Sequence, residues 1–213
     1  MLRRFLSLST VALLAAGAIA WTDTPPAADA AKAGSTTPAK AWLDRLKTLE
    51  GSWQSGDENG DGKPDTHVFY RVVSGGSAVA EFLMPGDPHE MVSVYHLDGD
   101  QLMMTHYCAL GNQPRMKAVS LSDSAAIKFD FVDGTNMKPT DMHIHSLTLT
   151  MVDSDHITAD WRAHNEGKEI EHGTAFKLER VKDAAAAKKI ADAVASPSKS
   201  VTPVAQPTEK GAK

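Results

Sequence analysis

Three histidines with strand-like spacing are the residues of this sequence best suited to chemistry. His143 and His145 are two positions apart, which puts both imidazoles on one face of a strand, and His106 lies in a second alternating segment. A neutral imidazole can contact an organic ligand, coordinate a transition metal or act as a general base. Cys108, the only cysteine, ends the segment of His106, and we expect it to be a small buried side chain rather than a nucleophile.

A hairpin predicted around Gly99 determines which side chains share a face with His106. An Asp-Gly pair between two alternating runs favours a two-residue turn, formed either by Asp98 and Gly99 or by Gly99 and Asp100. In both turns, the same side chains share a face with His106. We assign the more apolar face to a protein interior. It carries Met91, Ser93, Tyr95, Leu97, Leu102, Met104, His106 and Cys108.

A second predicted hairpin contains the other two histidines. Along His143–Val152 the residues alternate between two faces, and both histidines share a face with Leu147 and Leu149. A three-residue turn at 153–155 would match this face with the apolar positions of the next strand, Trp161 among them. The pattern therefore predicts that His143 and His145 point into the same interior as His106.

The polar loop Ala109–Pro114 follows the first hairpin and could orient the polar end of a ligand. Its amide side chains could equally satisfy only the backbone of the loop, and both alternatives stay open. Together with the inward positions, this loop predicts a binding site for a small, partly apolar molecule. The predicted ligand-binding residues are Tyr95, Met104, His106, Asn112, Gln113, Arg115, Phe129, Phe131, His143, His145 and Trp161.

Metal ions are weaker candidates. An H-x-H strand alone is weak evidence for a transition metal, and Leu147–Thr150 supplies no carboxylate, so we do not expect a metal at the histidines. An acidic loop matches the first nine positions of a calcium loop, but Val68 replaces the bidentate Glu of position twelve, which excludes an EF-hand. A weaker calcium site and a hydrophilic turn both remain open. The calcium candidates are Asp57, Asn59, Asp61, Lys63 and Asp65.

The elements that must position these residues are short strands separated by Gly, Asp, Asn or Pro. This spacing is typical of an all-β sandwich or barrel, and successive hairpins without intervening helices favour a single up-and-down antiparallel barrel of about ten strands. The predicted strands are Ser52–Ser55, His67–Val73, Ala78–Met84, Met91–Leu97, Gln101–Cys108, Arg115–Leu121, Ile127–Val132, His143–Val152, Ile157–His164 and Gly173–Arg180.

The chain divides into four predicted segments. Met1–Ala20 has the basic start, short apolar run and small-residue cleavage site of a signal peptide, which predicts a periplasmic or secreted protein without a stable membrane anchor after cleavage. Trp21–Lys40 reads as a flexible linker. Ala41–Val181 is the predicted barrel, preceded by a short helix at Ala41–Leu49, and Lys182–Lys213 is a basic tail, helical and then disordered.

Charge and cysteine content exclude other classes of protein. Ala41–Val181 contains 22 acidic against 12 basic residues, so nucleic acid is not an expected partner. A single cysteine allows no internal disulfide, so stability must come from an ordinary hydrophobic core. The sequence does not indicate the oligomeric state.

Two stretches carry a family resemblance. The Gly51-Ser52-Trp53 start matches the first strand of lipocalins, and Tyr70–Met116 resembles a bacterial family of exported lipocalin-like, calycin-type barrels to which no activity is assigned. The family is distantly similar to nitrobindin and fatty-acid-binding barrels. The resemblance implies a ten-stranded barrel with an internal cavity. Because Gln54–Gly60 lacks the glycine-rich opening of nitrobindins, it does not imply haem.

Three functional hypotheses follow. The first is an exported barrel that binds a small, partly apolar molecule in its interior. The second is an enzyme that uses the same interior, with the histidines as metal ligands or general bases. The third is a structural or interaction protein whose barrel is filled by its own side chains and whose tail docks elsewhere.

Overall fold

The structure is a computed structural model that describes residues 36–57, 59–121, 124–171 and 173–196 of the 213-residue chain. The predicted signal peptide Met1–Ala20, residues 21–35 of the predicted linker and residues 197–213 of the tail lie outside these residues. Within the described ranges, no helix is long and apolar enough to cross a membrane.

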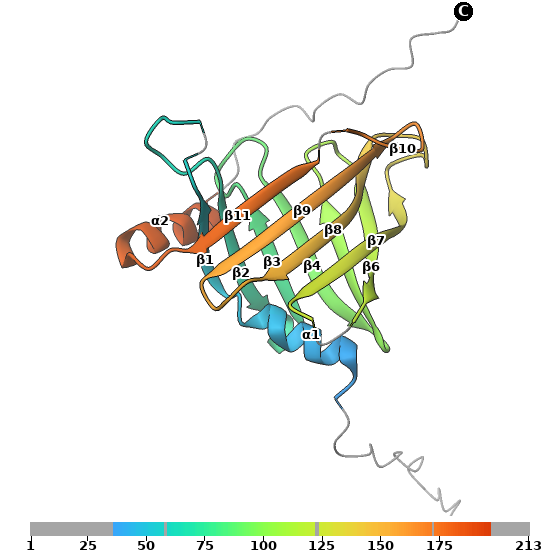
Figure 1. The fold of residues 1–213 in the computed structure, drawn as a ribbon, viewed down its shortest axis with the longest axis horizontal. Coiled ribbons are helices and arrows are strands. Elements are labelled where there is room, and N and C mark those ends of the chain that lie inside the picture. The colour runs from blue at the N-terminus through green and yellow to red at the C-terminus, as the bar shows by residue number, and fades with distance from the viewer. Residues whose placement is uncertain (1–35, 58, 122–123, 172, 197–213) are drawn as a thin grey trace, which may run out of the picture. The chain divides into compact units, whose positions relative to one another are not determined.

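Ten antiparallel strands close into an up-and-down barrel, which confirms the predicted fold (Figure 1). Each strand from β1 to β9 pairs with the next along the chain, and β11 pairs with both β9 and β1 to complete the ring. A two-residue strand, β10, pairs only with β9. The strands are β1 (Gly51–Ser55), β2 (His67–Val73), β3 (Ala78–Leu83), β4 (Met91–Asp98), β5 (Gln101–Tyr107), β6 (Gln113–Ser120), β7 (Ala126–Thr135), β8 (His143–Met151), β9 (His156–Asn165), β10 (Lys168–Glu169) and β11 (Thr174–Arg180).

The β4–β5 hairpin has the second of the two registers that the sequence allows. Asp98 pairs with Gln101, which leaves Gly99 and Asp100 as the turn, and Gly99 adopts a φ of 57°. Because parity is the same in both registers, the predicted interior face is confirmed. Its fully or almost fully buried members are Ser93, Tyr95, Leu102, Met104 and His106.

The β8–β9 hairpin is also confirmed in its central part. The Val152 N–H donates to the carbonyl oxygen of His156 at 3.0 Å, which leaves the predicted three-residue turn at 153–155. Leu147 lies opposite Trp161, and both side chains are buried in the barrel.

A β-bulge at the start of β8 interrupts this alternation. The register shifts between Ile144 and Ser146, so that Ile144 lies opposite Ala163, which shares the inward face of β9 with Trp161. His143 instead lies opposite His164, one position further along β9. The bulge therefore shifts His143 out of register with the inward face of β9, although its side chain stays buried, with 2% exposure. That His143 and His145 line the interior stays a prediction.

One end of the barrel is filled by helix α1 (Pro38–Lys47), which begins three residues earlier than predicted. Thr37 caps the helix by accepting a hydrogen bond from the Lys40 N–H, and Pro38 occupies the first turn, where a missing N–H costs nothing. The helix packs against β3, β4 and β5 and closes what we call the helix end (Figure 1). Its buried residues, which join the barrel core, are Ala39, Trp42, Leu43 and Leu46.

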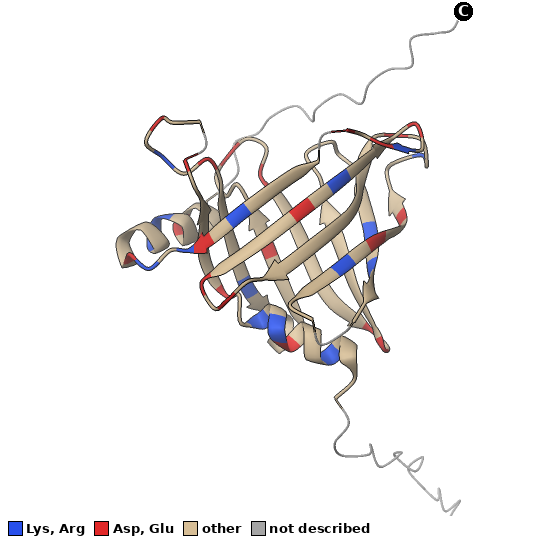
Figure 2. Ribbon diagram, viewed as in Figure 1, with Lys and Arg blue, Asp and Glu red and all other residues tan. Residues whose placement is uncertain are grey.

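The opposite end, which we call the loop end, carries connections such as 84–90, 108–112 and 136–142. Helix α2 (Ala184–Ala195) lies outside the barrel along β1 and β2, where it buries Ile190. Charged residues occur on both helices and on the visible strands β7, β9 and β11, as expected for side chains that face water (Figure 2).

Replacing Leu46 with alanine tests whether α1 is part of the core. Leu46 is fully buried in the barrel cluster, so Leu46→Ala should lower the free energy of unfolding by about 2–5 kcal/mol through lost contacts and a residual cavity. Urea denaturation followed by circular dichroism measures the change. Lys40→Ala, on the exposed side of the same helix, should change it by less than about 0.5 kcal/mol. Equal effects of the two substitutions would contradict this packing.

Candidate functional site

Four polar side chains form a continuous row across the inner wall of the barrel. Tyr70 of β2 lies directly opposite Glu81 of β3, Glu81 lies opposite Ser93 of β4, and Ser93 lies opposite His106 of β5. All four are buried. We call Tyr70, Glu81, Ser93 and His106 the polar row. Its members converge because the hairpins place them at matching positions on neighbouring strands.

Hydrogen bonds connect the polar row. The Tyr70 hydroxyl donates to Glu81 Oε1 at 2.7 Å, and the Tyr95 hydroxyl donates to Oε2 at 2.8 Å. Ser93 also hydrogen-bonds the Glu81 carboxyl group, and its oxygen lies 3.1 Å from Nδ1 of His106. Burial raises the pKa of Glu81, and the hydrogen bonds from the three hydroxyl groups oppose that shift.

His106 ends the row as a neutral imidazole. Its side chain is 1% exposed, and this burial lowers its pKa to about 4. The ring packs against Trp161 on the far side of the barrel, with centroids 5.1 Å apart and planes tilted by 45°. A base with so low a pKa is poorly matched to proton transfer near neutral pH, so the geometry suits hydrogen bonding better than general-base catalysis.

Among the described residues, four buried side-chain atoms have no hydrogen-bond partner, and three of them belong to predicted site residues. These three are Nε2 of His106, Nε1 of Trp161 and Oδ1 of Asn112. Asn112 is fully buried at the loop end, where its Nδ2 donates to the carbonyl oxygen of Met142 at 2.8 Å. Each such atom costs about 1–3 kcal/mol when nothing satisfies it, so the contacting rings of His106 and Trp161 mark a place where a small polar group would be stabilised.

The rest of the interior is occupied by large side chains, which limits the size of any guest. Predicted site residues Tyr95 and Phe129 are fully buried and in ring contact at 5.6 Å, and Met104 is also fully buried. They belong to the core that α1 completes. The candidate binding site in the interior therefore lies beside the contacting rings of His106 and Trp161, toward the loop end.

The predicted residues His143, His145 and Phe131 form a separate cluster with His164. The ring of Phe131 lies 4.5 Å from His143 and 5.2 Å from His145, and His145 stacks on His164 at 3.5 Å. The ring contact of His106 is instead with Trp161. The structure thus places the histidines in two groups, and no three His, Cys, Asp or Glu residues of the described chain are arranged to hold a metal ion.

Hydrogen bonds fix the tautomers of this second group when it is neutral. His143 Nδ1 lies 2.7 Å from the carbonyl oxygen of Asp141 and must donate to it, which leaves Nε2 to accept from His145 Nδ1 at 3.1 Å. Burial, followed by the proximity of His164 and His143, lowers the pKa of His145. Burial and the proximity of His143 lower the pKa of His164.

Two predicted residues face away from the interior. Arg115 is exposed and forms a two-pronged ion pair with Asp133 on β7, and Gln113 Nε2 donates to the carbonyl oxygen of Gly111 at 3.0 Å. The loop amide Gln113 thus satisfies local backbone, as one of the two alternatives predicts. Cys108 is partly buried, and burial raises the pKa of its thiol.

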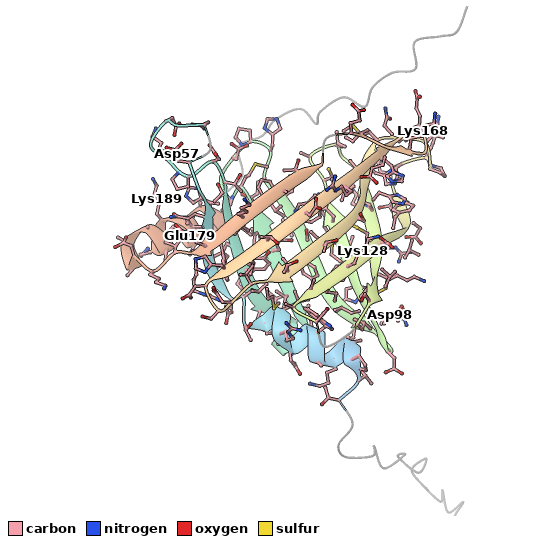
Figure 3. All side chains as sticks on the ribbon, viewed as in Figure 1. Asp57, Asp98, Lys128, Lys168, Glu179 and Lys189 are labelled. Atoms are coloured by element: carbon pink, nitrogen blue, oxygen red, sulfur yellow. The ribbon has the colours of Figure 1, made fainter. Side chains whose placement is uncertain are left out.

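The acidic loop lies at the loop end, with Asp57 labelled there and Asp98 at the helix end (Figure 3). The Asp57 carboxylate accepts hydrogen bonds from the N–H groups of Gly60, Asp61 and Gly62 at 2.7–3.0 Å. Asn59 also hydrogen-bonds Asp65. These oxygens organise a turn, and calcium at Asp57–Asp65 stays a prediction.

Surface hollows lie elsewhere on the described part of the molecule. Three have volumes of about 420, 320 and 360 Å³ and surround β1, β9, β11 and α2. None of the predicted ligand-binding residues lines them. The largest is bordered by Gly56, Val152, His156, Ile157, Thr158, Lys177, Leu178 and Glu179.

Sequence reasoning missed Glu81 and Tyr70 as site residues. Glu81 occupies the same face of β3 as Val79 and Leu83, so a carboxylate at an otherwise apolar position was the available signal. Aligning β2, β3 and β4 through their hairpins would have placed it beside Tyr70 and Ser93.

Comparisons with known proteins add little. No family model matches the sequence, and no curated protein matches it. Among solved structures, the chain is similar to Rv2717c from M. tuberculosis, at 17% identity with a TM-score of 0.42, over 70% of this chain and all of that one. So distant a likeness carries no information on the site. What the structure defines is an all-β protein with a closed ten-stranded barrel.

The low pKa of His106 predicts a loss of stability in acid. The unfolded chain binds a proton near pH 6.5 and the folded chain only near pH 4, so this contribution is complete above about pH 6.5 and declines as the pH falls toward 4. The loss attributable to His106 should be roughly 2 kcal/mol between about pH 7.5 and pH 5.

Urea denaturation of the wild type and His106→Phe at both pH values measures this loss. The variant keeps an aromatic ring against Trp161 but cannot titrate, so its stability should fall less. Glu81, whose raised pKa has the opposite effect on stability, is present in both proteins and largely cancels from the comparison. Equal losses in the two proteins would contradict the low pKa.

Proposed function

We propose that this protein is an exported, lipocalin-like barrel that binds a small, partly apolar molecule at the loop end of its interior. The observation that carries the proposal is the set of unpartnered polar atoms on His106, Trp161 and Asn112, all from buried side chains. Export rests on the predicted signal peptide Met1–Ala20, and the lipocalin-like class rests on the resemblance of Tyr70–Met116.

Apolar groups around the same place suit the carbon part of a ligand. Ala163 shares the inward face of β9 with Trp161, and Ile144 lies opposite Ala163 and packs against the core. Few polar groups on an apolar wall are typical of small-molecule sites. Because the core fills the helix end, we expect a ligand about the size of a single ring.

Native mass spectrometry of protein purified without denaturation tests this function. We expect a co-purified small molecule or, after addition of phenol, a one-to-one adduct. Ala163→Leu should reduce the adduct strongly because it fills space beside Trp161.

Ala118→Leu is the matched control. Ala118 is as exposed as Ala163, at 8%, and lies opposite Phe129 in the same core. The same three carbon atoms are added there without touching the candidate site, so the adduct should persist. Circular dichroism checks that both variants fold. Absence of any adduct in the wild type, or equal loss in both variants, would refute the proposed site.

A further inference from the structure

We propose that the ligand is an uncharged molecule with a hydroxyl group, an alcohol or a phenol, that donates to His106 Nε2 and accepts from Trp161 Nε1. This inference rests on the proposed function and specifies the chemistry of the same site. It comes from the direction of the hydrogen bonds in the polar row.

The polar row determines which nitrogen of His106 carries the proton. Glu81 accepts from the hydroxyl groups of Tyr70 and Tyr95, and Ser93 also hydrogen-bonds its carboxyl group. A serine hydroxyl has a single proton, so once Ser93 donates to Glu81 its oxygen can only accept from His106. With the Ser93 proton directed at Glu81, we infer that the proton of His106 is on Nδ1, 3.1 Å from the Ser93 oxygen, and that Nε2 presents a lone pair.

Trp161 needs a hydrogen-bond acceptor, whereas Nε2 of His106 needs a donor. Its Nε1–H can only donate, is buried and has no partner among the described residues. Its ring is in contact with that of His106, at a centroid distance of 5.1 Å. A hydroxyl group is the smallest organic group that can donate to one of these atoms and accept from the other. A ketone or an ether could satisfy only Trp161.

The charges around the site exclude an anionic ligand. The acidic group of the polar row is the buried carboxyl of Glu81, and burial keeps His106 uncharged near neutral pH. No Lys or Arg side chain in the described part of the chain is buried, so none could neutralise a carboxylate there. Desolvating an unpaired charge costs several kcal/mol, more than the available hydrogen bonds supply.

Three probes of similar size test the inference: phenol, anisole and benzoate. Anisole keeps the ring and the oxygen of phenol but has no donor, and benzoate carries a negative charge. Titration calorimetry should show phenol binding about tenfold more tightly than anisole, the value of one net hydrogen bond, with no measurable binding of benzoate. The indole Nε1–H resonance of Trp161 should shift on addition of phenol.

His106→Phe should abolish the preference for phenol over anisole, because it removes the acceptor and keeps a ring of similar size. His96→Phe is the matched control: His96 belongs to the same hairpin but to its outward face, where its Nδ1 lies 3.2 Å from the carbonyl oxygen of Leu97. The preference should survive in this variant.

The possible failures of the two proposals differ. If anisole or benzoate binds as tightly as phenol and Ala163→Leu weakens them all, the binding function stands and the inference is overturned. A preference for anisole would place the proton of His106 on Nε2 and would also overturn it. If no probe binds and no adduct is found by mass spectrometry, both proposals fail.

Discussion

The burial of the Glu81 carboxyl group is the interaction on which the interior of this barrel depends. A carboxyl group at this position must lose its hydration, and only hydrogen bonds from the protein can replace it. Tyr70, Tyr95 and Ser93 supply them from β2 and β4, the two strands that flank β3. The hydroxyl protons of both tyrosines are thereby directed at Glu81, and the proposed direction of the contact between Ser93 and His106 follows from the same arrangement.

The two ends of the barrel differ because α1 fills only one of them. Trp42, Leu43 and Leu46 join the core residues at the helix end, so apolar contact accounts for the stability of a fold that cannot contain an internal disulfide. At the loop end, backbone carbonyls and amide side chains link neighbouring loops, as in the bond from Asn112 to Met142. Unsatisfied polar atoms can persist at this end because the tightly packed core supplies the stability that they cost.

The fold was predictable because two of its determinants can be read from short stretches of sequence. These are the alternation of side chains along a strand and the residues that form the turns. The Asp98-Gly99 signal was enough to place Tyr95, Met104 and His106 inside, whichever register formed. Bulges were not predictable, since an extra residue in a strand leaves no mark in a short alternating pattern. One bulge shifts the register of His143 and His145 against β9, and their ring contacts are with Phe131 and His164, whereas His106 contacts Trp161.

The orientation of charged side chains was the other feature that the sequence did not predict correctly. A glutamate in a strand is expected to face water, so Glu81 was not considered for the interior, whereas Arg115 was given a role that its exposed pairing with Asp133 does not support. Among the described residues, the candidate site contains no buried cation, and its histidine stays neutral near neutral pH. Selectivity in such a site comes from the orientation of hydrogen bonds, because a ligand that matches in shape but not in donors leaves buried atoms unpaired. In the proposed site, the polar row therefore selects a ligand through the lone pair on Nε2 of His106.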